Sequence, residues 1–184
     1  LGIFMIFPII IQIIYNEFDD TFVISSLITI IVGILFLLSN LSQNKKINLQ
    51  QAFLLTALSW ISIAFFGSLP LIFSSLQLTF VDAFFESMSG ITTTGSTVIN
   101  DLINAPKSIL FWRAILQWLG GIGIVVMAIT LMPLMNIGGM QLFKIDSSDS
   151  SEKILPKTRE VALSIFSIYF FLTLICLLSY FVVG

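Results

Sequence analysis

Long apolar runs separated by short polar segments organise this chain of 184 residues. Four runs contain no Asp, Glu, Lys or Arg: 21–44, 47–81, 114–143 and 161–184. A bilayer core of about 30 Å is crossed by about 20 apolar residues in helical conformation, so each run can supply one membrane span. Together with the apolar N-terminal stretch, the pattern predicts five transmembrane helices, at roughly 2–15, 21–39, 49–68, 108–132 and 158–183.

The first and third of these helices carry signals for their limits. Only about 15 apolar residues precede Glu17, which as helix is about 22 Å and short of a full span. We therefore expect the sequence to begin inside its first helix. The third helix is expected to stop near Pro70, because proline has no N–H for the helical hydrogen-bond ladder.

Composition supports a membrane protein and narrows its chemistry. Charged residues make up 10% of the chain, against about 25% in soluble domains. The pattern therefore predicts an all-α integral membrane fold. The chain has no histidine, which excludes an imidazole base, the common zinc sites and Ser-His-Asp triads. The apolar spans also lack paired acids, so we expect no enzyme.

Basic residues in the loops predict the orientation of the helices. Lys45 and Lys46 lie in one loop, and the linker 136–157 is the other basic one. Because loops rich in Lys and Arg stay in the cytoplasm, both are expected on that side. This holds only if residues 71–107 make no net crossing, so that segment is predicted to enter and leave from the outer face.

The segment 71–107 contains a helical pattern that is too short to span a bilayer. Residues 81–91 make a helix of about 16 Å, which is half the hydrocarbon depth. The return through 92–97 cannot face lipid with unpaired backbone groups, so it must be buried or line water. Such a return can offer backbone carbonyls to a dehydrated cation, as potassium filters do. The alternative is an ordinary extracellular loop.

Five motifs carry a family resemblance: Asp82–Glu86 (DAFFE), Ser89–Gly95 (SGITTTG), Phe111–Arg113 (FWR), Gln117–Gly123 (QWLGGIG) and Gly138–Phe143 (GGMQLF). Together they resemble the first pore loop and neighbouring segments of the Trk/Ktr/HKT potassium transporters, most closely the bacterial Trk membrane subunit. The resemblance covers nearly the whole chain. It implies a pore of four helix–pore loop–helix repeats in one polypeptide, of which this chain holds the first repeat and the opening helix of the second.

The resemblance also divides the chain into segments. These are a two-helix N-terminal domain (1–44), the first repeat (45–135) with its pore helix (81–91) and filter (92–97), a cytoplasmic linker (136–157) and the first helix of the second repeat (158–184). In the family, filter carbonyls bind K⁺. This implies K⁺ binding by the carbonyls of Thr92, Thr93, Thr94 and Gly95, with the ion placed at Thr92 and Thr93.

Four further residues are expected to support the filter: Asp82, Glu86, Gly90 and Arg113. Arg113 is costly if it faces lipid, so we expect it to pair with Glu86 or Asp82.

Small and aromatic residues of the fourth predicted helix allow two interpretations. Gly120, Gly121 and Gly123 either pack helices closely or form a gating hinge. Trp112 and Trp118 are expected to anchor the helix at the membrane interface, where tryptophan is enriched.

The resemblance implies K⁺ uptake across the bacterial inner membrane by symport or channel-like permeation, with H⁺ or Na⁺ coupling left open. The expected partners are K⁺, the lipid bilayer, a second copy of the full-length protein and a cytosolic nucleotide-binding regulatory ring of the TrkA type. No covalent cofactor and no nucleic acid are expected, and NAD or ATP/ADP would act only through that ring. The alternatives are a Na⁺-permeable relative and a membrane fragment that transports nothing.

Overall fold

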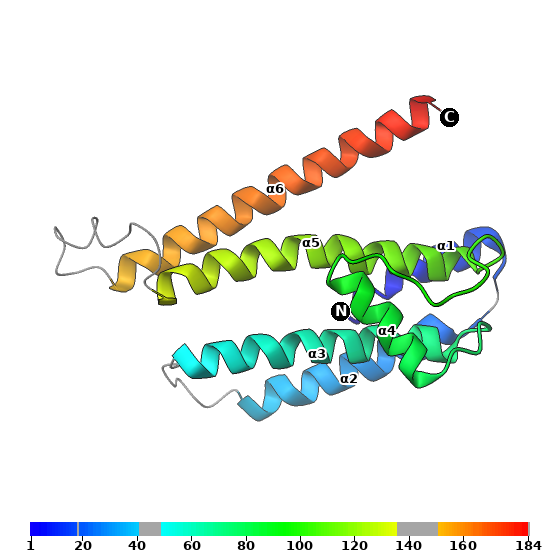
Figure 1. Cartoon of the computed structure of the whole chain (residues 1–184), viewed down its shortest axis with the longest axis horizontal. Helices are drawn as coiled ribbons and strands as arrows, with labels where there is room; N and C mark the ends of the chain where they lie inside the picture. Colours follow the sequence, from blue (N-terminus) through cyan, green and yellow to red (C-terminus); the bar gives the residue numbers. More distant parts are fainter. Residues whose placement is uncertain (18, 41–48, 136–150, 184) are drawn as a thin grey trace. The chain divides into compact units, whose positions relative to one another are not determined.

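The computed structural model describes residues 1–17, 19–40, 49–135 and 151–183 (Figure 1). They form six helices: α1 (Ile6–Tyr15), α2 (Thr21–Asn40), α3 (Leu49–Phe73), α4 (Phe80–Ile91), α5 (Lys107–Met135) and α6 (Ser151–Val183). The described residues contain no strand, so the prediction of an all-α fold is confirmed. The chain divides into two compact units, Leu1–Gly121 and Ile122–Gly184, with the boundary inside α5.

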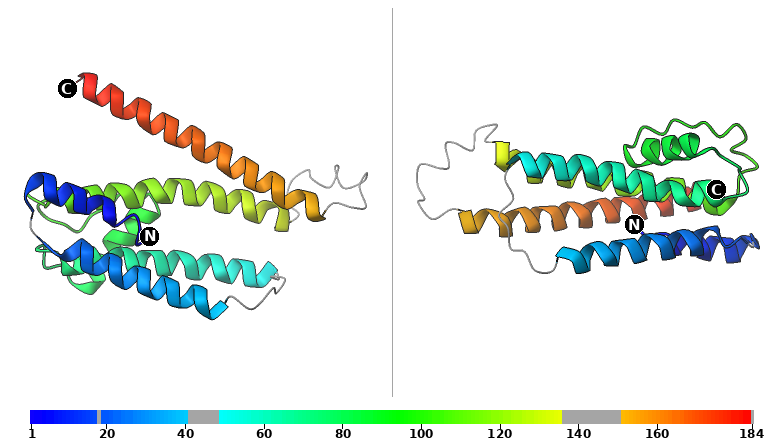
Figure 2. Two further views of the ribbon diagram at one scale, coloured as in Figure 1. Left: turned by 180° about the vertical axis from the view of Figure 1, so that it is seen from behind. Right: turned by 90° about the horizontal axis from the view of Figure 1, so that it is seen from below.

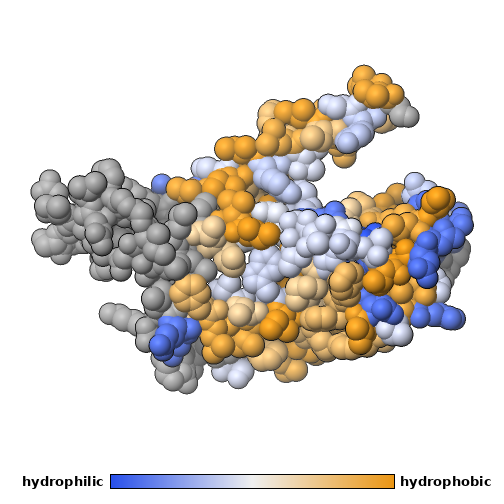
Figure 3. Space-filling model, in the orientation of Figure 1, coloured by the Kyte–Doolittle hydropathy of each residue, from blue (hydrophilic) through white to orange (hydrophobic). Residues whose placement is uncertain are grey.

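Among the described residues, four of the five predicted spans form helices that are long and apolar enough to cross a membrane. They are Thr21–Ser39, Gln50–Phe73, Lys107–Ala128 and Glu160–Val183. The remaining predicted span, at the N-terminus, corresponds to α1 and has only 10 helical residues. Large apolar side chains remain exposed along these helices, and Figure 3 shows broad hydrophobic areas on the surface. Such a surface is stable in lipid and unstable in water, so the chain is a multi-pass membrane protein.

In the first unit, the C-terminal end of α3 and the N-terminal end of α5 lie at the same end, and the segment between them begins and finishes there. Figure 1 shows α4 running from that end back toward the middle of α3, after which the chain returns to the start of α5. The views in Figure 2 also place α4 beside α3. Because α3 and α5 run in opposite directions on either side of it, the segment adds no further pass through this unit.

Helix α3 continues through Pro70 to Phe73, so the predicted stop at this proline is wrong. Pro70 cannot donate to the carbonyl four residues earlier. However, Pro70 and Leu71 are completely buried, and the indole N–H of Trp112 bonds to the nearby carbonyl of Gly67 at 2.9 Å. The carbonyl that loses its helical donor is that of Phe66, so this bond does not replace the missing one, and close packing around Pro70 and Leu71 accompanies the uninterrupted helix.

Helices α5 and α6 are longer than their apolar runs predict. Helix α5 ends at Met135, a few residues beyond the expected limit, and α6 begins at Ser151 instead of near 158. The candidate span within α6 begins only at Glu160. Apolarity marks the part of a helix that can lie in lipid, whereas the helix itself can extend into polar sequence. The motif at 138–143 lies outside the described residues.

The core of the first unit joins helices that are far apart in the sequence. Its fully or nearly fully buried side chains include Met5, Phe22, Leu71, Ile109, Trp112 and Leu116. Phe22 of α2 meets the ring of Trp112 edge-on at a centroid distance of 6.1 Å. This core fixes the first half of α5 against α2 and α3, which places one face of α5 behind α4.

Candidate functional site

The first turn of α4 is capped by its own side chains. Thr79 is the N-cap residue, and its Oγ1 accepts from the backbone N–H of Asp82 at 3.2 Å. The same hydroxyl donates to Oδ2 of Asp82 at 2.7 Å. An acid in the first turn also meets the positive end of the helix dipole. Asp82 thus stabilises the start of α4, at the opposite end of the helix from residues 92–95.

At its other end, α4 stops in a Schellman motif. The N–H of Thr93 donates to the carbonyl of Gly90 at 2.9 Å, and the N–H of Thr94 donates to the carbonyl of Ser89 at 3.0 Å. Thr93 has φ 59°, the left-handed conformation that this motif requires. A β-branched residue is rarely found there. The N–H of Gly95, at φ 77°, also donates to Ser89, at 3.2 Å.

These hydrogen bonds decide where the following carbonyls point. In a trans peptide the C=O lies opposite the N–H of the next residue. The N–H groups of Thr93, Thr94 and Gly95 face back to α4, so the carbonyls of Thr92, Thr93 and Thr94 face away from it. Among the described residues, none of these three carbonyls accepts a hydrogen bond. Residues 92–98 are exposed, so the carbonyls form an open, polar row.

The threonine hydroxyls of this row are bonded among themselves. Oγ1 of Thr92 donates to the carbonyl of Met88 at 2.8 Å. It also lies 2.9 Å from Oγ1 of Thr94. Since the Thr92 proton is given to Met88, the Thr94 hydroxyl is the donor between the two threonines. Both side chains therefore brace the turn through their hydroxyl protons.

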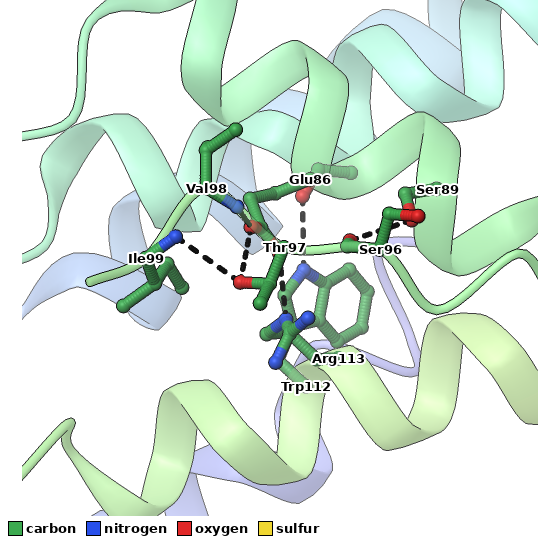
Figure 4. A network of polar contacts seen from close by, with 9 residues as sticks. Glu86, Ser89, Ser96, Thr97, Val98, Ile99, Trp112 and Arg113 are labelled. Carbon is green, nitrogen blue, oxygen red and sulfur yellow. Dashed lines mark hydrogen bonds and ion pairs between the residues drawn. The ribbon is translucent and has the colours of Figure 1, made fainter. Parts of the chain in front are cut away.

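The next part of the segment is held by two side chains of α4, shown in Figure 4. Oγ of Ser89 donates to the carbonyl of Ser96 at 2.7 Å. Oε1 of Glu86 accepts from Oγ1 of Thr97 and from the N–H of Val98, both at 2.5 Å. Glu86 and Ser89 lie three residues apart and hence on one face of the helix. The spacing of three residues from Glu86 could have predicted that Ser89 also holds the segment, but Ser89 was not among the predicted support residues.

Arg113 of α5 neutralises Glu86, one of its two expected partners. Its Nε lies 2.8 Å from Oε2 of Glu86, and the two side chains are 15% and 0% exposed. Oε2 has no hydrogen-bond partner in the described chain. The contact is therefore an ion pair, which places a charge-compensated acid behind residues 97 and 98.

Two glycines let α5 approach the end of α4. A Cβ on Gly120 would collide with the backbone of Ile91, the last residue of α4. A Cβ on Gly90 would lie 3.1 Å from Cβ of Leu116. Close packing therefore accounts for Gly90 and Gly120. Gly121 and Gly123 follow in α5 and are half-buried.

Trp112 is a core residue, and its expected role as an anchor in the membrane interface is wrong. The side chain is completely buried, and its Nε1 donates to Gly67 of α3. The partner carbonyl lies 45 residues away in the sequence, so neither its position nor its availability could be read from the motif. Trp118 is half-buried.

No group of three or more His, Cys, Asp or Glu side chains in the described ranges could hold a metal ion.

Comparisons with known proteins decide the family. The sequence model of the TrkH family, described as a cation transport protein, matches residues 19–183. This chain belongs to the TrkH family. The family transports ions and catalyses no covalent reaction, which confirms the expectation that the chain is not an enzyme.

The relatives of this TrkH-family chain include proteins named as Trk system potassium uptake proteins. It is 40% identical over its whole length to the Trk system potassium uptake protein TrkI of Halomonas elongata. It is 36% identical over 98% of its length to TrkH of Escherichia coli K12. In each case it spans 38% of the relative's length. The crystal structure of the potassium transporter TrkH from Vibrio parahaemolyticus matches the whole chain with a TM-score of 0.82 and 32% identity, over 36% of that protein.

Proposed function

We propose that this chain contributes one filter segment to a potassium uptake pathway in the bacterial inner membrane. The carbonyls of Thr92, Thr93, Thr94 and Gly95 would bind K⁺ after it sheds its water. One observation carries the proposal: three successive carbonyls of Thr92–Thr94 face away from α4, because the N–H groups that follow them are all bonded to that helix, and no described residue donates to them. Rings of such carbonyls replace the hydration shell in potassium filters.

The charges around the segment suit a cation that must also leave. The C-terminal end of a helix carries about half a negative charge, and α4 ends at these residues. Glu86 is paired with Arg113 and adds little net charge. Partial charges of carbonyls thus dominate the site, which allows binding weak enough for conduction.

One row of carbonyls surrounds a cation on one side only. The chain spans 38% of the length of its relatives, so we propose that similar segments elsewhere in a longer polypeptide complete the ring. In this arrangement residues 45–135 form the first repeat and residues 158–184 the first helix of the next. The polar segment would open to the outside, with Lys45, Lys46 and the linker 136–157 in the cytoplasm.

Uptake would be driven at least by the membrane potential. Moving one charge through 100 mV yields about 2.3 kcal/mol, enough for roughly 50-fold accumulation. The family resemblance further supports a homodimer of the full-length protein and a cytosolic nucleotide-binding ring of the TrkA type, through which NAD or ATP/ADP would act. Coupling to H⁺ or Na⁺ would add to the driving force.

The test compares two glycine variants in the full-length protein, produced in cells that lack other K⁺ uptake systems. Gly95 has φ 77°, and a side chain there is strained. Gly33 has open space around its Cβ position. We expect Gly95→Ala to reduce K⁺ uptake strongly and Gly95→Asp to abolish it, with Gly33→Ala unchanged. Normal uptake by both Gly95 variants would reject the filter, whereas absence of uptake by the unmodified protein would favour a non-transporting protein. Competition by Na⁺ identifies a Na⁺-permeable relative.

A further inference from the structure

One peptide group in the segment 91–98 is not held by a hydrogen bond. The peptides before Gly95 are fixed by N–H groups that donate to α4. The peptides after Ser96 are fixed through the Ser96 carbonyl and the Val98 N–H. The peptide between Gly95 and Ser96 is the exception: within the described chain, neither its carbonyl nor its N–H has a hydrogen-bond partner. Its orientation must therefore be set by something other than α4.

The free peptide matters because it carries the Gly95 carbonyl. If this peptide turns by 180°, an N–H replaces the carbonyl in the row, and its positive end repels a cation. Gly95 permits such a turn because glycine occupies both halves of φ space with little cost. A fixed orientation with the carbonyl in the row requires an acceptor for the Ser96 N–H on the opposite side of the peptide.

Helix α5 presents a polar side chain at this place. A Cβ on Gly95 would lie 3.5 Å from Nε2 of Gln117. Gln117 is half-buried, and it makes no hydrogen bond to the residues that the structure describes. Because the two ends of a side-chain amide exchange by a half turn, Gln117 can present Oε1 to the Ser96 N–H.

The neighbours of Gln117 show that this face of α5 follows the segment step by step. Arg113, one turn before it, binds the acid that holds Val98. Gly120, nearly one turn after it, contacts the backbone of Ile91. Gln117 lies between them, as Gly95 lies between residues 98 and 91. Its position beside Gly95 thus follows from two packed contacts on either side, in addition to one distance.

We propose that Gln117 is a positioning residue of the filter. Its side-chain oxygen accepts from the Ser96 N–H and keeps the Gly95 carbonyl in the cation-binding row. This inference rests on the proposed function of residues 92–95 and assigns to the QWLGGIG motif a role in ion selectivity. Gln117 itself does not touch the ion.

The test uses three substitutions at Gln117 in the full-length protein, with K⁺ uptake and its inhibition by Na⁺ measured at matched membrane abundance. Gln117→Glu keeps an acceptor at the same reach. Gln117→Leu removes it, and Gln117→Asn withdraws it by one methylene. We expect Gln117→Leu and Gln117→Asn to raise the ratio of the KM for K⁺ to the inhibition constant for Na⁺ by about fivefold. This is the factor for one hydrogen bond of ordinary net strength. Glu should retain the selectivity of the unmodified protein.

Gln50→Leu, an exposed position at the start of α3, is the matched control and should change nothing. Unchanged selectivity in Gln117→Leu and Gln117→Asn would overturn the inference. The inference would also be overturned if Gln117→Glu lost as much selectivity as these two variants, because an acceptor at position 117 would then not preserve selectivity. Absence of K⁺ uptake by the unmodified protein would instead reject the proposed function, so the two failures are distinguishable.

Discussion

The carboxylate of Glu17 caps the N-terminus of α5 across 91 residues of sequence. Oε1 accepts from the N–H of Lys107 at 2.6 Å, and Oε2 accepts from the N–H and the Oγ of Ser108 at 3.1 and 2.6 Å. The first N–H groups of a helix have no partners within it. Glu17 thus ties the turn between α1 and α2 to the helix that carries Arg113 and Gln117.

Loss of this cap should destabilise the first unit. We expect Glu17→Gln to lower the free energy of unfolding by about 1 kcal/mol, because a neutral amide is a weaker acceptor and has only one oxygen. Thermal unfolding of the full-length protein in detergent would measure the change. Asp20→Asn, an exposed acid of the same turn, is the control. Equal stability of both variants would argue against the cap.

The same contact predicts a pH dependence. Burial raises the pKa of Glu17, but the Ser108 hydroxyl, the N–H groups of Lys107 and Ser108 and the Lys107 charge together lower it below its ordinary value. A lowered folded-state pKa means that the contribution to stability is present above the ordinary value of 4.5 and is lost as the pH falls through the folded value. The stability difference between the unmodified protein and Glu17→Gln should therefore shrink below about pH 4.5. A difference that stays constant to lower pH would contradict this.

The pair of Arg113 and Glu86 should behave as a unit. Arg113→Leu leaves a buried carboxylate without compensation, which typically costs about 3–5 kcal/mol. We expect loss of stability together with loss of uptake. Adding Glu86→Gln should restore much of the stability, since the amide oxygen still accepts from Val98 and no charge remains. A double-variant cycle in unfolding free energy gives the coupling. Additive effects would show that the two side chains act independently, and unchanged uptake in Arg113→Leu would remove the support role.

Gly120 should be intolerant of even a methyl group. Its Cβ would meet the backbone of Ile91, and a backbone cannot move aside as a flexible side chain can. We expect Gly120→Ala to cost about 1–3 kcal/mol or more and to displace the end of α4. Gly33→Ala, with open space at its Cβ position, should be neutral or slightly stabilising because alanine favours helix. A Gly120→Ala variant as stable as Gly33→Ala would indicate that α4 and α5 are less closely packed.

The apolar runs predicted the helices well because membrane insertion depends on length and hydropathy, which are local properties. The short helix at 80–91 was also predictable, since its pattern ends after about three turns. The Glu17 cap, the bond from Trp112 to Gly67 and the position of Gln117 beside Gly95 were not. Each joins residues far apart in the sequence, and packing between helices selects the partner. Pro70 misled for the same reason, because the packing that surrounds it in the folded unit cannot be read from the local sequence.

The Schellman turn after α4 has a consequence for how this segment can vary. The carbonyl row is aligned by main-chain groups of residues 89–95, which all amino acids except proline possess. Side chains at positions 92–94 can therefore change with modest effect if they accept the same backbone angles. The number of residues in the turn matters more, because one inserted or deleted residue would pair every later N–H with the wrong carbonyl. We expect positions 92–94 to tolerate substitution far better than the segment tolerates any change in length.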